Sequence, residues 1–289
     1  MPLAAACLGG PAFAAEGPSP PSYSLPWLLR SAAIANVVRL DETLAFFDQP
    51  DGTSSGTYVT SFQAARKVGR FAPVLRESWV HNSPGASQSG SGFSNPLVGV
   101  SYVRPAGVWR ASAFFATTLP LGSGGGDNPE PATQAAMSAA INARSGMDNA
   151  LFAVNYWTLI AGVGAARVTP SLTLQVEATL LQLTRVRGPE SQDGSRTNFT
   201  AGLHVGHFFS RRLSLGGELR VQLWLSDAAP VRKDPAAREQ ATLAAGPRLH
   251  FKLGGTSWIR PGLSYSRALD KPMSSKGYGI VQLDVPMSF

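Results

Sequence analysis

The sequence predicts an all-β protein, a single antiparallel, up-and-down transmembrane β-barrel of about twelve strands. Three observations predict this fold. Apolar and polar residues alternate with a period of two along most of the chain, the alternating segments are longer than ordinary strands, and short and long connections alternate between them. The composition agrees, because charged residues make up only 15% of the chain and no run of 18 apolar residues could form a membrane-spanning helix.

The N-terminal residues divide into two segments that precede the barrel. Residues 1–14 are apolar and Ala-rich and end in a small-x-small sequence, which predicts a signal peptide of less than the usual length, as if truncated. Residues 15–26 are rich in proline and serine and are expected to form an extended periplasmic linker. The barrel then takes residues 27–289. The only cysteine, Cys7, precedes it, so no disulfide is expected.

The segment 213–225 shows the alternation clearly. One face carries Glu218 and Arg220 among other polar residues, and the opposite face carries Leu213, Leu215, Leu219, Val221, Leu223 and Leu225. A soluble β-sandwich alternates in the same way, but its strands usually have only five or six residues. The alternating segments here run for roughly ten to fourteen residues, which is enough for a tilted crossing of a bilayer with the apolar face in lipid.

Strands and connections follow from this pattern. The strands are expected near 32–47, 56–67, 72–82, 96–104, 108–119, 150–165, 171–185, 197–209, 213–225, 240–252, 257–267 and 277–289. Short turns fall at 68–71, 105–107, 167–170, 210–212 and 254–256, and long polar loops at 48–55, 83–95, 120–149, 186–196, 226–239 and 268–276. Bacterial outer-membrane barrels have short periplasmic turns and long external loops, and an even strand count places both termini in the periplasm. Glu42 falls on the apolar face of the first strand, which suggests a β-bulge there.

The polar face of the strands is expected to line the lumen. Its charged and titratable residues would be Arg110, Glu177, Arg185, Glu218, Arg220, Arg248, His250, Lys252, Arg260 and Asp284. If these residues line an aqueous pore, their basic excess favours anionic or neutral solutes. If they pair with one another across the interior, the barrel is plugged, as in small closed barrels.

The long loop 120–149 is expected to contain a helix and to hold no cofactor or metal. The Ala-rich stretch 128–143 has high helix propensity, and its helix could constrict the mouth of the barrel or lie on the surface. The glycine-rich residues 121–126 lack the Gly-Lys-Ser/Thr of a phosphate-binding loop. Three polar residues could offer oxygen ligands to Ca²⁺ but do not define a site, namely Asp127, Asn128 and Glu130.

Enzymatic activity and nucleic-acid binding are not expected. Some twelve-stranded barrels are phospholipases with a Ser/His pair on the lipid-facing wall, but only His207 is expected to face lipid here. Neither a Gly-x-Ser-x-Gly nor a His-Glu-x-x-His sequence is present. The net charge of +7 comes from Lys and Arg residues that are spread singly along the chain, without a basic cluster.

The C-terminal strand carries a resemblance to a known class of proteins. Apolar residues alternate along it and the chain ends in an aromatic residue, the set being Val281, Leu283, Val285, Met287 and Phe289. This strand resembles the C-terminal strand by which the barrel-assembly machinery recognises Gram-negative outer-membrane proteins. The resemblance implies that this machinery is a partner and that Phe289 is an assembly signal.

The chain as a whole resembles Gram-negative outer-membrane proteins that are described as transporters. The sequences that carry this resemblance are Val37-Val-Arg-Leu40, Asn95-Pro-Leu-Val-Gly99, Ala178-Thr-Leu-Leu-Gln-Leu-Thr-Arg185 and Arg260-Pro-Gly-Leu-Ser-Tyr265, and it covers most of residues 25–289. Similarity to FadL-type hydrocarbon channels and to the outer-membrane proteins of phenol meta-cleavage pathways is architectural. Too few residues follow the leader for the N-terminal plug of the fatty-acid channels, so no such plug is expected.

The function implied is passage of a small molecule across the outer membrane. The barrel would be surrounded by outer-membrane lipid and would let a small solute, anionic or hydrophobic, pass by passive diffusion. The alternative is a plugged structural or adhesion barrel that acts through its external loops.

Overall fold

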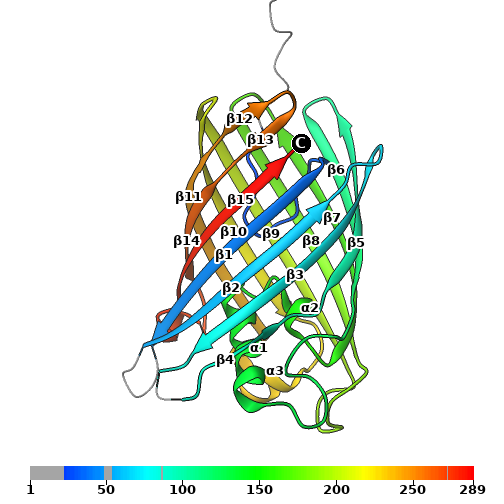
Figure 1. The fold of residues 1–289 in the computed structure, drawn as a ribbon, viewed down its shortest axis with the longest axis vertical. Helices are drawn as coiled ribbons and strands as arrows, with labels where there is room; N and C mark the ends of the chain where they lie inside the picture. Colours follow the sequence, from blue (N-terminus) through cyan, green and yellow to red (C-terminus); the bar gives the residue numbers. More distant parts are fainter. Residues whose placement is uncertain (1–22, 49–53, 86, 272) are drawn as a thin grey trace, which may run out of the picture.

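The computed structural model describes residues 23–48, 54–85, 87–271 and 273–289. The expected signal peptide and residues 15–22 of the expected linker lie outside the described residues. Twelve antiparallel strands close into one barrel, and the pairing of the first ring strand with the last closes it (Figure 1). The predicted fold class and the predicted number of strands are confirmed.

Each ring strand pairs with the next one along the chain. The ring consists of β1 (Val37–Asp48), β2 (Ser54–Ala65), β3 (Phe71–Ser83), β5 (Leu97–Ala106), β6 (Trp109–Thr118), β7 (Tyr156–Val168), β8 (Leu172–Arg185), β9 (Ser195–Ser210), β10 (Leu213–Trp224), β11 (Glu239–Leu249), β14 (Gly262–Ala268) and β15 (Gly279–Ser288). Three short strands extend it. The strand β4 (Gly90–Phe93) pairs with β3, and β12 (Phe251–Gly254) pairs with β13 (Ser257–Ile259), which also pairs with β15.

The alternation of the sequence decides which side chains face lipid and which face the lumen. In β10, Leu215 is 47% exposed on the outer face, whereas Ser214 and Glu218 are fully buried on the inner face. Large apolar side chains cover the outside of the other ring strands in the same way. Hydrocarbon offers no partner to a free backbone N–H or C=O group, so a sheet in lipid is stable only when it closes on itself.

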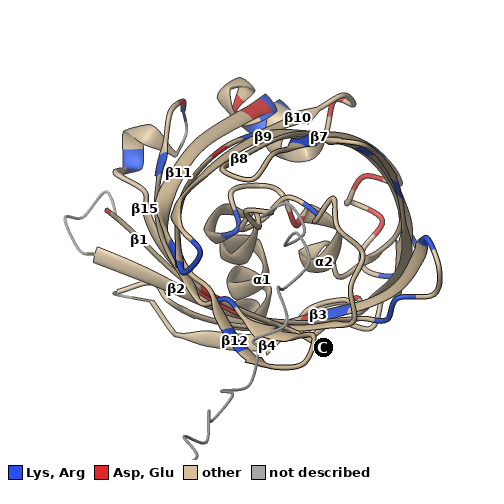
Figure 2. Cartoon of the chain, turned by 90° about the horizontal axis from the view of Figure 1, so that it is seen from above, with Lys and Arg blue, Asp and Glu red and all other residues tan. Residues whose placement is uncertain are grey.

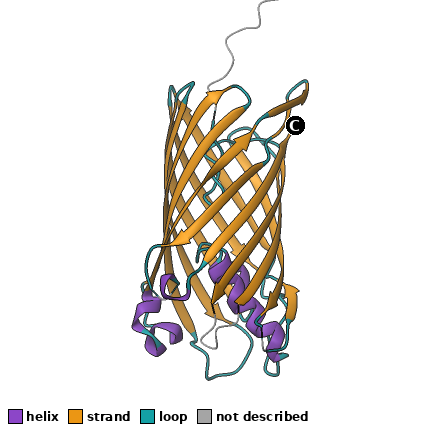
Figure 3. Cartoon of the chain, turned by 90° about the vertical axis from the view of Figure 1, so that its left-hand side faces the viewer, coloured by secondary structure: helices purple, strands orange, loops and turns teal. Residues whose placement is uncertain are grey.

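The two ends of the barrel differ in the length of their connections. Short turns join the strands at the end where β1 begins and β15 ends, and long loops join them at the other end (Figure 1). The long loops hold the helices, namely α1 (Pro131–Ala143), α2 (Asn149–Phe152), α3 (Ala229–Lys233), η1 (Pro235–Arg238) and η2 (Ser274–Lys276) (Figure 3). Short turns face the periplasm in outer-membrane barrels, so the short-turn end is designated periplasmic and the long-loop end external. None of the helices in the described ranges is long and apolar enough to cross a membrane.

The expected β-bulge at Glu42 is wrong. The strand β1 pairs with β2 and with β15 without a shift of register, so Glu42 stays on the outer face between Leu40 and Leu44. Its carboxylate accepts a hydrogen bond from Thr60 Oγ1 at 2.8 Å. A hydroxyl of the neighbouring strand therefore gives this lipid-facing carboxylate a polar partner, and the register needs no correction.

Several strand boundaries differ from the prediction, each for a local reason. The strand β1 begins at Val37 rather than near residue 32, because the residues before it lie inside the barrel. The strand β7 begins at Tyr156 rather than near residue 150, because α2 precedes it. The strand expected at 257–267 breaks at Pro261, which has no N–H group to continue the ladder, while its carbonyl accepts a bond from Leu249 N at 2.8 Å.

Two segments of the chain occupy the lumen. The first, here named the lumenal strap (residues 23–36), enters from the periplasmic end and returns there to begin β1. The second, here named the loop insert (residues 119–155), enters from the external end and places α1 and α2 inside the ring of strands (Figure 2). Residues 23–26 therefore lie within the barrel rather than in a periplasmic linker. The sequence does not predict an N-terminal segment inside the lumen, and the expected absence concerns only the N-terminal plug of the fatty-acid channels.

Candidate functional site

Glu218 holds the middle of the lumenal strap. It is fully buried on the inner face of β10 and accepts hydrogen bonds from two backbone N–H groups, that of Trp27 at 2.8 Å and that of Leu28 at 2.9 Å. Hydrogen bonds to an ionised acceptor are roughly twice as strong as neutral ones. One carboxylate thus accepts hydrogen bonds from two consecutive backbone N–H groups of the strap, which is not part of the β-sheet.

Two other wall residues bind the strap on either side of this point. Glu177 on β8 accepts a hydrogen bond from the backbone N–H of Arg30 at 2.7 Å and also pairs with the Arg30 guanidinium. Arg39 on β1 donates to the carbonyl of Trp27 and pairs with Asp284 on β15, with 2.5 Å between Nε and Oδ1. Charged side chains from opposite parts of the ring, those of Glu177 and Arg39, therefore form hydrogen bonds with the backbone of the strap.

Tyr23 closes the strap on itself. Its hydroxyl donates to the side chain of Gln175 on β8 and accepts a hydrogen bond from the backbone N–H of Ala32 at 2.8 Å. The guanidinium of Arg110 lies over its ring, 5.1 Å from the ring centre. The strap is therefore a closed loop, in which a hydrogen bond joins its first residue, Tyr23, to Ala32 near its end.

Glycines on the inner wall make room for the strap, and they include Gly216 of β10 and both Gly202 and Gly206 of β9. A Cβ atom on Gly216 of β10 would lie 2.9 Å from the Trp27 ring, and one on Gly202 of β9 would lie 2.6 Å from a methyl of Leu29. Close-packed interiors do not admit such approaches without displacement. A larger residue at either position would therefore push the strap away from the wall.

The helix of the loop insert begins with a side-chain cap and lies close to the wall. Glu130, considered above as a calcium ligand, accepts a hydrogen bond from Thr133 N at 3.0 Å, and Pro131 occupies the first helical turn. Small buried residues allow the close approach, namely Ala132, Ala136, Ala140 and Ala143. The predicted helix is therefore present, and it lies inside the barrel mouth rather than on the surface.

A network of four charges fixes the inner end of the loop insert. Arg144, which follows α1, pairs with Asp41 of β1 and with Asp148 at 2.9 Å. Asp148 also accepts two hydrogen bonds from the guanidinium of Arg76 on β3, at 2.8 and 2.6 Å. Burial alone would raise the pKa of Asp148, but the guanidinium groups of Arg76 and Arg144 outweigh it and lower that pKa to about 2. Removing one partner would leave a buried charge unpaired, which typically costs about 3–5 kcal/mol.

Arg220 connects the strap to the insert. Its Nε donates to Glu218 at 2.6 Å, and its Nη1 donates to Ser145 Oγ at 3.3 Å. Ser145 directly follows the charged end of the insert and has a φ of 56°, a left-handed conformation that a non-glycine residue rarely adopts. The two segments that fill the lumen therefore meet at one ion pair on β10.

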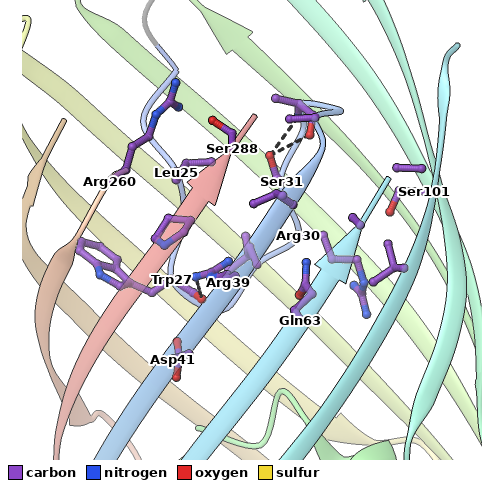
Figure 4. A pocket seen from close by; sticks show the side chains of 18 of the residues that line it. Leu25, Trp27, Arg30, Ser31, Arg39, Asp41, Gln63, Ser101, Arg260 and Ser288 are labelled. Carbon is purple, nitrogen blue, oxygen red and sulfur yellow. Dashed lines mark hydrogen bonds between the residues drawn. The ribbon is translucent and has the colours of Figure 1, made fainter. Parts of the chain in front are cut away.

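A cavity of about 1020 Å³ lies between the strap, the insert and the wall. Its lining extends from Trp258 and Ser288 at the periplasmic end to Asp148 and Leu151 of the insert. Figure 4 shows Trp27, Arg30, Arg39 and Asp41 around it. A stretch of its wall is apolar, formed by Leu97, Phe114, Ile160 and Leu181.

Half of the predicted lumen-lining residues are held in ion pairs. Glu177, Glu218, Arg220, Arg248 and Asp284 face inward, and each takes part in at least one ion pair with the wall or the strap. Arg248 and Asp284 join β11 to β15 across β14, with 2.5 Å between Nη2 and Oδ2. At mid-height the charges therefore pair with one another instead of forming an aqueous ring of free charges.

The other predicted residues lie nearer the ends of the barrel. Arg110, His250, Lys252 and Arg260 line the periplasmic part of the cavity. Arg185 lies at the external end of β8, where its Nη1 donates to the carbonyl of Gly188 at 3.0 Å. The predicted set is therefore divided between the middle of the lumen, its periplasmic mouth and its external rim.

A buried serine–histidine contact occurs twice in the described part of the lumen, and in one of them Ser24 Oγ of the strap lies 3.3 Å from Nε2 of His204. In the other, Ser214 Oγ lies 2.8 Å from Nε2 of His250, and both side chains are almost fully buried. In the described part of the chain no acidic residue makes an ion pair with His250. The contact joins β10 to the residue that follows β11, and the side chain of Ser214 is fully buried.

Sequence reasoning misses the residues that bind the two inserted segments. Asp41 and Arg76 occupy inner positions of their strands by alternation, so their place in the lumen could be read from the pattern. Their partners Arg144 and Asp148 lie in a loop, where no periodicity gives a side-chain direction. Glycines on the polar face, such as Gly202, are the signal that something packs closely against the wall.

Comparison with known proteins agrees with the fold. A protein-family model described as "Putative MetA-pathway of phenol degradation" matches residues 26–267. The COG4313 outer-membrane channel from Pseudomonas putida F1 aligns with a TM-score of 0.55 and 11% identity, covering 92% of this chain and 97% of that one. The NanC porin aligns with a TM-score of 0.49 and 10% identity, covering 86% and 98%. A search of curated protein sequences gave no match. At 11% identity the likeness to the COG4313 channel shows the fold alone, that of an outer-membrane barrel.

Proposed function

Since the chain belongs to the outer-membrane family described as "Putative MetA-pathway of phenol degradation", we propose that it is a gated channel for passive diffusion of a small solute. The observation that carries the proposal is the cavity of about 1020 Å³ inside the barrel. Ligand pockets for small molecules have volumes of roughly 300–1,000 Å³. A barrel that served only as a support for its loops would have no need of a space of this size. Diffusion needs no catalytic step, and the proposal includes none.

The described conformation is the closed one. The strap crosses the lumen at the height of Glu218, and the insert narrows the external mouth with α1 and α2. Both segments line the cavity. A solute can therefore pass from one end to the other only when the strap moves.

The strap is the segment that is built to move. Its bonds to the wall come from side chains, such as those of Glu177, Glu218 and Arg39. In the described residues its backbone makes one hydrogen bond to the barrel backbone, from Phe289 N to the carbonyl of Asn36 at its very end. It can therefore leave the lumen without breaking the ladder of any strand.

The insert is held more firmly and acts as a constriction. Its buried charge network includes residues of β1 and β3, and the backbone N–H of Asn95 donates to the carbonyl of Leu151 at 2.7 Å. Asn95 also donates through its side chain to the carbonyl of Ala153 at 3.0 Å. The insert therefore narrows the external half of the path, and the strap closes the periplasmic half.

Planar-bilayer recordings test the proposal. The full chain and a variant lacking residues 23–34 would be refolded and compared for single-channel conductance and open probability. We expect brief openings of the full chain and long openings of the variant. A second variant lacking residues 128–143 should have a larger conductance in each opening, because it removes most of α1.

Silence of all three proteins would overturn the proposal. That outcome would favour the alternative, a plugged barrel that acts through its external loops. Each variant must first show the heat-modifiable electrophoretic mobility of a folded barrel. If a deletion prevents folding, Arg144→Gln releases the insert and Glu218→Ala releases the strap without changing the length of the chain.

A further inference from the structure

The periplasmic mouth of the cavity carries a set of basic residues from separate parts of the chain. Here named the basic vestibule, it consists of Arg110 on β6, Arg211 in the turn after β9, Lys252 on β12 and Arg260 after β13. All four line the same cavity. Lys252 and Arg260 come from the paired strands β12 and β13 and the residue after them, Arg211 comes from the turn between β9 and β10, and Arg110 comes from β6, so the set spans several strands instead of forming a row on one strand.

These four cations have no ion-pair partner in the described part of the chain. The arginines deeper in the lumen differ in this respect, since Arg30, Arg144 and Arg248 each pair with a carboxylate. The acidic residues that line the cavity, Asp41 and Asp148, lie at its inner end and are held by arginines there. The middle of the lumen is thus neutralised, and the vestibule keeps an excess of positive charge.

Two of these guanidinium groups are oriented by aromatic rings. Arg260 lies over the Trp258 ring at 5.6 Å from its centre, and its Nε is buried without a hydrogen-bond partner. Arg110 lies over the Tyr23 ring at 5.1 Å and donates only a long bond, of 3.4 Å, to the carbonyl of Ala32. An aromatic face orients a guanidinium group, while the N–H edge remains available to bind the two oxygens of a carboxylate.

The vestibule opens onto an apolar surface. Leu25 and Ile34 of the strap and Val37 of β1 line the cavity beside it, and Phe114 and Leu181 continue the apolar wall inward. A simple inorganic anion would leave this surface facing water. A molecule with an apolar body and one anionic group would cover the apolar wall and neutralise the vestibule at the same time.

We infer that the vestibule is a binding site for organic carboxylates, small molecules with one carboxylate on an aromatic or short aliphatic body. This inference rests on the proposed channel function and specifies the solute class. The carboxylate binds Arg110 and Arg260, and Lys252 and Arg211 draw it toward the opening. The apolar body lies against the strap and the inner wall of the cavity.

Calorimetry on the folded full chain in detergent tests the inference without requiring conduction. The probes are benzoate, benzyl alcohol as a neutral molecule of the same shape, and inorganic phosphate as an anion without an apolar body. We expect benzoate to bind with a Kd at least about tenfold below that of benzyl alcohol, as one charge-assisted contact provides. We expect phosphate at the same concentration not to displace it.

Variants separate the vestibule from the overall charge of the protein. The double variant Arg110→Gln/Arg260→Gln should bind benzoate no better than benzyl alcohol, and Arg110→Lys/Arg260→Lys should recover part of the difference. The matched control is Arg104→Gln/Arg167→Gln, which removes two exposed positive charges at the same end of the barrel. These two arginines lie on the outer face of β5 and β7 and do not line the cavity.

Three results would overturn the inference. Benzoate could bind no better than benzyl alcohol, the control variant could lose as much affinity as the vestibule variant, or phosphate could compete equally with benzoate. If only the channel proposal is wrong, the protein will bind benzoate as expected but will show no conductance in planar bilayers. The two proposals can therefore be rejected separately.

Discussion

The backbone N–H of Trp27 lies 2.8 Å from a carboxylate oxygen of Glu218, although 191 positions separate the two residues in the sequence. The same carboxylate pairs with Arg220, which reaches Ser145 of the loop insert. One buried charge on β10 therefore connects the periplasmic and the external segments of the lumen. Release of either segment changes the surroundings of the other.

Replacing Glu218 should open the channel. Glu218→Ala removes the acceptor of two strap N–H groups and leaves Arg220 without its carboxylate, so the closed conformation loses about 3–5 kcal/mol of stabilisation. We expect the open probability in planar bilayers to rise at least tenfold. Glu42→Gln is the control, since Glu42 lies on the outer face of β1 and does not contact the strap. Equal effects of the two variants would contradict this prediction.

A larger side chain at Gly216 should displace the strap by volume alone. Gly216→Leu would place its Cβ 2.9 Å from the Trp27 ring, so the ring must leave its position. We expect longer channel openings and faster proteolysis of the strap from the periplasmic side. Gly217→Ala is the matched control, because Gly217 faces outward and its Cβ would meet its nearest neighbour at an ordinary 3.8 Å. An unchanged proteolysis rate for Gly216→Leu would show that the strap is not packed there.

The outline of the barrel could be predicted because lipid imposes a rule on each strand. Outward positions must be apolar wherever hydrocarbon covers them, so the alternation of Leu213 and Leu215 with polar residues identifies the outer face of β10 from the sequence alone. Short turns, such as that at 210–212, then fix which strands are neighbours. Glu42 is an exception to this rule, because its outward carboxylate is held by Thr60 of the neighbouring strand, and the sequence does not show that partner.

The contents of the lumen could not be predicted in the same way. Residues 23–36 have no repeating pattern, and their partners Glu177 and Glu218 lie on strands far along the chain. The charged residues of the lumen were recognised as inward-facing, but alternation gives the direction of a side chain and not its partner. Glu218 is bound by two backbone N–H groups of the lumenal strap and does not face water. The sequence of the strap has no alternating pattern from which this contact could be predicted.

The anchoring of the loop insert should be insensitive to moderate acidification. The pKa of Asp148 is lowered to about 2, below its ordinary value of about 3.9, so its stabilising effect is present above about pH 4 and is lost as the pH falls through 2. We expect the single-channel conductance of the natural chain to stay constant from pH 7 to pH 5. An increase within that range would contradict the assignment of the insert as the fixed constriction.

Replacing Asp148 by a neutral residue should release the loop insert at pH 7, as protonation of Asp148 in strong acid would do in the natural chain. Asp148→Asn leaves Arg76 and Arg144 buried together with only one carboxylate, that of Asp41, between them. We expect a larger conductance at pH 7 in planar bilayers, because the insert moves away from the wall. Asp127→Asn serves as the control, since it removes one negative charge from the same loop outside the charge network. A conductance equal to that of the natural chain would show that the insert is held by packing alone.

Phe289 should matter for assembly more than for stability. It follows β15 at the closing seam, where its backbone N–H donates to the carbonyl of Asn36 at 3.1 Å, while its side chain is 55% exposed on the outside. Phe289→Ala keeps the backbone bond, so the purified variant should refold in detergent with normal heat-modifiable mobility. In cells we expect the amount in the outer membrane to fall severalfold, because the barrel-assembly machinery would read the aromatic terminus. Met287→Ala on the same face of β15 should have little effect. If Phe289→Ala lowers refolding in detergent as much as assembly in cells, the side chain has a structural role and not a signalling one.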